Sequence, residues 1–102
     1  MRAVNVITPI VFIMFSLANA QQQCLLTVFV KDAETKKPVP EALILIDGNQ
    51  SGITDAQGHW QKELSCRYIS ITVQHLNFEA VSQNLQLSES KKEIIIWLKP
   101  KT

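Results

Sequence analysis

The 102-residue sequence lacks a cluster of positive charge. Ten Lys and Arg residues stand against nine Asp and Glu residues, so the formal net charge is only +1. The two signs are also interspersed, as where Lys36 and Lys37 are followed by Glu41. Binding to nucleic acid needs a basic patch or stripe on one face. The composition therefore argues against a nucleic-acid partner.

Residues 21–102 also lack an apolar run that could span a membrane, which takes about 20 residues. The longest apolar run, residues 10–17, lies near the N-terminus and is too short. It follows the positively charged Arg2 and precedes Ala18-Asn19-Ala20, small residues at the positions that signal peptidase reads. We expect residues 1–20 to be a signal peptide and residues 21–102 to be one exported domain. A retained N-terminal anchor is the alternative.

Helical periodicity is missing after residue 20, and alternation of period two takes its place. Leu26, Val28 and Val30, for example, fall on one face of a predicted strand. The short apolar run Ala42–Ile46 is typical of a strand that is covered on both faces. The predicted strands span residues 25–30, 42–46, 52–54, 59–64, 67–76, 79–87 and 93–99. Their number and spacing predict an all-β, seven-stranded antiparallel sandwich with Greek-key connections.

Two cysteines, Cys24 and Cys66, are the only ones in the chain. In an exported protein an even pair usually forms a disulfide. A bridge between them would stabilise a small domain whose hydrophobic core is limited. We expect the disulfide; two separate buried thiols are the alternative.

Turn-forming residues lie between the predicted strands. Asp32 and Thr35 can accept hydrogen bonds from nearby backbone groups, and Pro38 keeps the chain extended. In a second turn, Asp55 can accept backbone N–H groups and Gly58 can adopt a left-handed conformation. The structural residues predicted in these two turns and beside them are Asp32, Thr35, Pro38, Thr54, Asp55, Gly58 and the core anchor Trp60.

These motifs resemble those of the carboxypeptidase regulatory-like domain, a transthyretin-like seven-stranded sandwich. The resemblance rests on four sequence marks: Asp32-x-x-Thr35-x-x-Pro38-Val39, Ala42 with its apolar strand, Thr54-Asp55-x-x-Gly58-x-Trp60, and Tyr68-Ile69-x-Ile71-x-Val73-x-His75-Leu76-x-Phe78. Similar domains stand at the N-termini of TonB-dependent receptors of Bacteroidetes-type bacteria, often with cysteines where Cys24 and Cys66 occur. The resemblance implies an accessory domain of the cell envelope, in the periplasm, at the outer membrane or outside the cell.

A receptor of that kind would continue into a TonB-interacting segment, a plug and a barrel. The sequence ends at Thr102, so the resemblance extends to the accessory domain and not to receptor activity. The chain is expected to be a stand-alone module or the N-terminal part of such a receptor, with another envelope protein or receptor component as partner.

No constellation of catalytic residues is recognisable in the sequence, and we expect neither an enzyme nor a cofactor. The spacings His59-x-x-x-Glu63 and His75-x-x-x-Glu79 suggest a metal site at first sight. On a strand, however, residues i and i+4 lie about 13 Å apart. A metal also needs three or four converging ligands, so we expect no metal site.

The residues that remain for recognition are few. His75, Asn77, Phe78 and Glu79 form a predicted loop that could contact a protein partner. The alternative function is a carbohydrate- or small-ligand-binding module, which would need an exposed aromatic platform. Trp97 decides that alternative, because Ile94, Ile96 and Leu98 are predicted to take the inner face of its strand. An exposed Trp97 beside Tyr68 would favour ligand binding.

Overall fold

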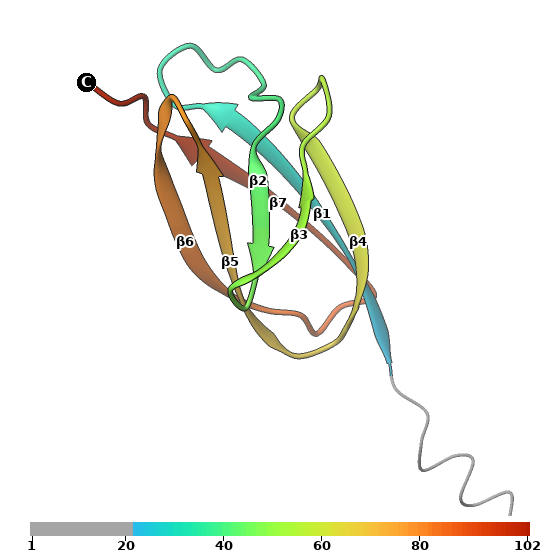
Figure 1. Cartoon of the computed structure of the whole chain (residues 1–102). Coiled ribbons are helices and arrows are strands. Elements are labelled where there is room, and N and C mark those ends of the chain that lie inside the picture. The colour runs from blue at the N-terminus through green and yellow to red at the C-terminus, as the bar shows by residue number, and fades with distance from the viewer. Residues whose placement is uncertain (1–21) are drawn as a thin grey trace, which may run out of the picture.

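The computed structural model describes residues 22–102, and the predicted signal peptide, residues 1–20, lies outside them. All regular elements in this range are strands (Figure 1). No helix in residues 22–102 is therefore available to cross a membrane. The strands are β1 (Gln23–Asp32), β2 (Leu43–Ile46), β3 (Asn49–Ile53), β4 (His59–Ser65), β5 (Tyr68–His75), β6 (Phe78–Gln86) and β7 (Lys91–Leu98).

The seven strands form a β-sandwich of two sheets. One sheet has the order β4-β1-β7 and the other the order β3-β2-β5-β6. Alternate residues of each strand point into the space between the sheets, which is why the period-two pattern was informative. The all-β class and the predicted inner faces are confirmed. The buried core includes Leu26, Val28, Val30, Ile44, Ile46, Trp60, Ile69, Ile71, Val73, Ile96 and Leu98.

The sheets are not purely antiparallel, and on this point the prediction was wrong. β1 and β7 pair in parallel, from Leu25 opposite Lys91 to Asp32 opposite Leu98. The reason lies in the preceding segment, residues 87–90, which crosses from β6 to the other sheet. It brings the chain beside the start of β1, where the Leu25 N–H donates to the Ser90 carbonyl at 2.8 Å. β7 then has to run in the same direction as β1.

The hairpin between β2 and β3 also differs from the prediction. Asp47 and Gly48 both have positive φ, 51° and 82°, as in the two-residue turns that match the twist of a hairpin. Asn49 therefore opens β3 instead of belonging to the turn, and Thr54 lies beyond the end of β3. The strand was predicted over residues 52–54, so its start was placed three residues too late and its end one residue too late.

β2 is not covered on both faces. Ile44 and Ile46 are buried in the core, whereas Leu43 and Leu45 are only half-buried on the outer face of the sheet. Within residues 22–102 no element packs over that outer face, since the structure contains only two sheets. A continuous apolar run therefore did not indicate a strand buried on both sides.

A disulfide joins Cys24 of β1 to Cys66, which confirms the predicted bridge. The two Cα atoms lie 5.2 Å apart. Cys66 stands where the chain passes from β4 in the three-stranded sheet to β5 in the four-stranded sheet. The bridge therefore ties the start of β1 to this crossing, at the end of the sandwich opposite the β5–β6 hairpin (Figure 1).

Candidate functional site

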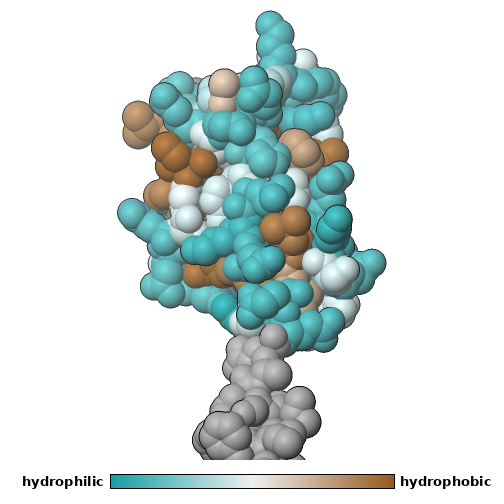
Figure 2. Space-filling view, turned by 90° about the vertical axis from the view of Figure 1, so that its right-hand side faces the viewer, coloured by the Kyte–Doolittle hydropathy of each residue, from teal (hydrophilic) through white to brown (hydrophobic). Residues whose placement is uncertain are grey.

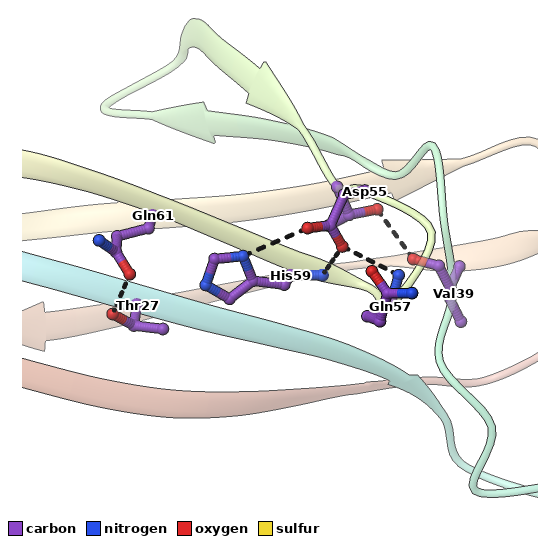
Figure 3. Close-up of polar contacts among 7 residues, drawn as sticks. Thr27, Val39, Asp55, Gln57, His59 and Gln61 are labelled. Carbon is purple, nitrogen blue, oxygen red and sulfur yellow. Dashed lines mark hydrogen bonds and ion pairs between the residues drawn. The ribbon is translucent and has the colours of Figure 1, made fainter.

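The turn after β3 is built around the Asp55 carboxylate (Figure 3). Its Oδ1 accepts the N–H groups of Gln57 and His59, both at 2.9 Å. Gly58 has a φ of 71°, as predicted, and its carbonyl accepts the Val30 N–H at 2.7 Å. A Cβ at Gly58 would lie only 2.4 Å from the Val30 carbonyl oxygen. The turn thus needs glycine both for its backbone conformation and for its contact with β1.

Thr54 has a role that the sequence did not reveal. Its side chain is buried, and its hydroxyl donates to the Val39 carbonyl at 2.8 Å while accepting the Ala42 N–H at 2.9 Å. The hydroxyl thereby holds the segment between β1 and β2 against the end of β3. The position of Thr54 directly before the Asp-x-x-Gly turn was the available signal for a structural role. Its hydrogen-bond partners, Val39 and Ala42, are too distant in sequence to be predicted.

The Asp32 turn forms as expected. Asp32 Oδ1 accepts the N–H groups of Glu34 and Thr35 at 2.7 and 3.2 Å. The Glu34 N–H is the main cause that lowers the pKa of Asp32. The His59 N–H likewise lowers the pKa of Asp55. Both carboxylates are therefore ionised acceptors within their own turns at neutral pH, and neither is poised to donate a proton.

The predicted interaction loop is a tight β-hairpin. His75 is the last residue of β5, and Phe78 and Glu79 begin β6, so only Leu76 and Asn77 form the turn. The His75 and Phe78 rings meet edge to face, with centroids 5.2 Å apart. The Asn77 N–H donates to His75 Nδ1 at 3.1 Å. Of the four residues expected on this loop, only Asn77 lies in the turn, because β5 and β6 pair up to His75 and Phe78.

Leu76, at the tip of this hairpin, is the most exposed large hydrophobic residue in the described part of the chain, at 89%. Sequence reasoning assigned it to a strand and missed it. Phe78, in contrast, is half-buried and packs against the core. The available signal was an apolar residue, Leu76, directly before Asn77, a residue type that is common in turns.

The C-terminal segment closes the same end of the sandwich. The Glu79 N–H donates to the Lys99 carbonyl at 2.8 Å, and the Lys101 N–H donates to the Asn77 carbonyl at 3.0 Å. The chain that leaves β7 in one sheet therefore pairs with the start of β6 in the other.

We call the surface formed by the β5–β6 hairpin, residues 37–41 and residues 99–101 the hairpin end. It carries two grooves. The larger, about 460 Å³, is lined by Glu41, Leu43, Leu76, Ala80 and Lys101 among others. The smaller, about 370 Å³, lies against Pro38, Val39 and Pro40. His75 and Phe78 line both grooves, so the hairpin separates them.

The side of the molecule that carries β4 shows no comparable site. On the side that carries β4, hydrophobic residues form separate patches within a mainly hydrophilic surface (Figure 2). Docking surfaces of soluble proteins usually show a larger contiguous apolar patch. Among the faces that the structure describes, the hairpin end combines grooves with an exposed apolar residue and is the candidate functional site.

Within residues 22–102, the exposed aromatic residues Trp97 and Tyr68 do not form one platform. Trp97 is 44% exposed and Tyr68 is 70% exposed. Trp97 lies near the end of β7 in the three-stranded sheet, whereas Tyr68 begins β5 in the four-stranded sheet, so they occupy different sheets. Lys31 and Lys36 place their Nζ atoms 5.9 and 5.0 Å from the centre of the Trp97 ring.

The histidines are held by structural contacts. His59 Nδ1 lies 3.4 Å from Asp55 Oδ2. His75 and Glu79 lie on successive strands of a hairpin and not on one strand. Across residues 22–102, no group of three His, Cys, Asp or Glu side chains converges in the manner of a metal site.

Fold and site together define a small β-sandwich module that is linked by a disulfide and carries a grooved end. No protein-family model and no curated protein matches the sequence. Among solved structures it is similar to mercury-inhibited catechol 1,2-dioxygenase from Acinetobacter sp. ADP1, with a TM-score of 0.65 and 11% identity. The match covers 80% of this chain and 54% of the dioxygenase chain. At that identity the likeness shows the fold alone.

Proposed function

We propose that the chain is a non-enzymatic, exported accessory module that mediates protein interaction at the bacterial cell envelope. It belongs, in this proposal, to the transthyretin-like class with Greek-key connections and is a carboxypeptidase regulatory-like domain. It acts either alone or as the N-terminal part of a TonB-dependent receptor, in the periplasm, at the outer membrane or outside the cell.

The observation that carries the proposal is the exposure of Leu76 beside a groove. Removing an apolar side chain at the tip of a hairpin from water lowers the free energy, which favours binding of a partner there. The adjacent Leu43 and Ala80 extend the apolar surface, and Glu41 and Lys101 place opposite charges on the same groove. An apolar centre with a charged rim is the usual anatomy of a protein interface.

The disulfide supports the exported location. Disulfides persist in oxidising compartments outside the cytosol, and the bridge between Cys24 and Cys66 is compatible with such a compartment. An N-terminal sequence that starts at Gln21 in the exported protein would agree with the proposed signal peptide.

Site-specific crosslinking tests the interaction. A photoreactive residue at position 76 is expected to give one discrete adduct with an envelope protein when cells are irradiated. The same residue at Gln83, exposed on β6 away from the hairpin, serves as the matched control. A further Glu41→Lys substitution should weaken the adduct by reversing a rim charge. Equal adduct yields from positions 76 and 83 would contradict the proposal.

A ligand-binding module is the second candidate function. The exposed ring of Trp97 favours it, because aromatic side chains with one free face bind ligands by stacking. The separation of Trp97 from Tyr68 means that a ligand would meet one aromatic ring at this place and not two.

A further inference from the structure

Two lysines are held against the exposed ring of Trp97. Lys31 pairs with Trp97 across the parallel strands β1 and β7. Lys36 reaches the ring from the turn after β1, where it adopts a φ of 68° and its Nζ donates to the Ala33 carbonyl at 2.8 Å. Attraction between an ammonium group and an indole ring accounts for both contacts. The result is two positive charges gathered at one ring.

Neither lysine has a carboxylate partner within residues 22–102. The ion pairs in that range join Asp55 to His59 and Asp47 to Arg67. The nearby Asp32 carboxylate is engaged by backbone N–H groups in its own turn. Asp32 keeps its negative charge and attracts Lys36 electrostatically, so one carboxylate stands near two ammonium groups. A ligand with a negative group would pair with the positive charge that remains.

The surrounding sheet face carries both apolar and polar groups. Phe29 lies on the same face of β1 as Lys31, two residues away, and it pairs with Ile95 of β7 and His59 of β4. Ile95 is 47% exposed. The next pair along the sheet is Thr27 and Gln61, whose side-chain oxygens lie 3.3 Å apart. We call this surface, formed by Thr27, Phe29, Lys31, Lys36, His59, Gln61, Ile95 and Trp97, the Trp97 face.

We propose that the Trp97 face binds a polysaccharide that carries carboxylate groups. The C–H faces of a sugar pack on aromatic rings, its hydroxyls can hydrogen-bond Thr27 and Gln61, and its carboxylate pairs with Lys31 and Lys36. An acidic peptide such as polyglutamate would also use the lysines, but it presents no flat C–H face to stack on the ring. The inference rests on the second candidate function and is independent of the hairpin end.

The acidic side chain on this face of β7, Glu93, pairs with Thr27 and therefore lies beside the part of the Trp97 face assigned to the sugar hydroxyls, away from the two lysines. Glu93 lies four residues before Trp97, which places it about 13 Å away along the strand. Charges separated by more than about 8 Å at physiological ionic strength are largely screened at a surface. A carboxylate bound at Trp97 is therefore attracted by the two nearby lysines more strongly than it is repelled by Glu93.

Calorimetric titration of the exported, oxidised protein tests the inference with three polymers: polygalacturonate, neutral dextran and polyglutamate. Polygalacturonate should bind, and Lys31→Gln/Lys36→Gln should weaken its affinity about tenfold or more. Trp97→Ala should weaken it as well. The matched control is Lys62→Gln/Lys91→Gln, which removes the same charge from exposed positions of the same sheet away from Trp97. Urea unfolding of each variant verifies that it is folded.

Each result has a distinct meaning. Unchanged polygalacturonate binding by Lys31→Gln/Lys36→Gln, or equal losses in the control, would overturn the site. If polyglutamate binds as tightly as polygalacturonate, the proposed polysaccharide ligand is overturned in favour of an acidic peptide. Dextran binding that depends on Trp97 but not on the lysines would overturn the anionic ligand and keep the ligand-binding function. If none of the three polymers binds, both the anionic ligand and the ligand-binding function are overturned. The crosslinking test at Leu76 is unaffected by that result.

Discussion

At the scale of single residues, a few side chains join parts of the chain that are far apart in sequence. Thr54 is the clearest case, since one hydroxyl satisfies two backbone groups of the segment between β1 and β2. Both contacts are buried, so water cannot replace them when the hydroxyl is removed. The energetic role of Thr54 is therefore larger than that of a surface turn residue.

Thr54→Val keeps the shape of the side chain and removes the hydroxyl. We expect the free energy of unfolding to fall by about 2 kcal/mol, because the Ala42 N–H and the Val39 carbonyl lose a buried partner. Urea unfolding measures the difference. Thr54→Ser, which retains the hydroxyl, should lose distinctly less; equal losses in the two variants would show that packing and not hydrogen bonding governs the site.

Asp47 makes stability depend on pH. The Ser70 N–H and the Arg67 guanidinium hold the pKa of this carboxyl below its usual value of 3.8. Because the pKa is lower in the folded state, the stabilisation is complete above the unfolded pKa and is lost as the pH falls through the folded pKa. Asp47→Asn, which tolerates the positive φ of this turn, should flatten the fall of unfolding free energy below about pH 4.

The measurement is urea unfolding at a series of pH values from neutral into the acid range. Glu89→Gln removes one negative charge from an exposed loop and serves as the control for net charge. Asp32 and Asp55 have lowered pKa values too, so Asp47→Asn should reduce the acid sensitivity without abolishing it. A pH profile of Asp47→Asn parallel to that of the unmodified protein would contradict the assignment.

At the scale of elements, β3 and β4 are edge strands of opposite sheets, and Trp60 lies where they face one another. A Cβ placed on Gly52 of β3 would come within 2.4 Å of Trp60 Nε1. The indole therefore packs directly on the backbone of the other sheet. In this way one large side chain closes the side of the sandwich that strand pairing leaves open.

Gly52→Ala should lower the free energy of unfolding by about 1–3 kcal/mol, because the added methyl group overpacks against Trp60. Trp60→Phe should also be destabilising, but the double variant should be less unstable than the sum of the two losses by about 1 kcal/mol. Denaturant unfolding of the four proteins gives this coupling. Strictly additive losses would mean that Gly52 and Trp60 do not act together.

The elements themselves were largely predictable. Alternation placed Ile69, Ile71 and Val73 of β5 on the inner face, and Trp97 on the outer face of β7, because side-chain direction in a strand is a local property. The boundaries of β3 were not predictable, since they depend on positive φ at Asp47, a residue that is not glycine. The parallel direction of β7 was hidden for a different reason: strand direction depends on where the chain crosses between sheets.

At the scale of the whole molecule, the disulfide spans 42 residues of sequence. On the chain-entropy model a loop of that length stabilises the folded state by about 4 kcal/mol. In Cys24→Ala/Cys66→Ala, the free energy of unfolding measured with urea should be lower by an amount of this order. The native exported protein should show no thiol to alkylating reagents and should gain two labelled sites after reduction; two thiols that react before reduction would refute the bridge.

By itself, the sequence determined that the chain is all-β, which residues face the core, and that two turns are stabilised by aspartate, because these features depend on neighbouring residues. Only the tertiary structure decided that the β5–β6 hairpin, residues 37–41 and the C-terminal segment meet at one end. It also decided that Lys31 and Lys36 gather at Trp97. These juxtapositions arise from strand order and from crossings between sheets, which are non-local and leave no pattern in adjacent residues.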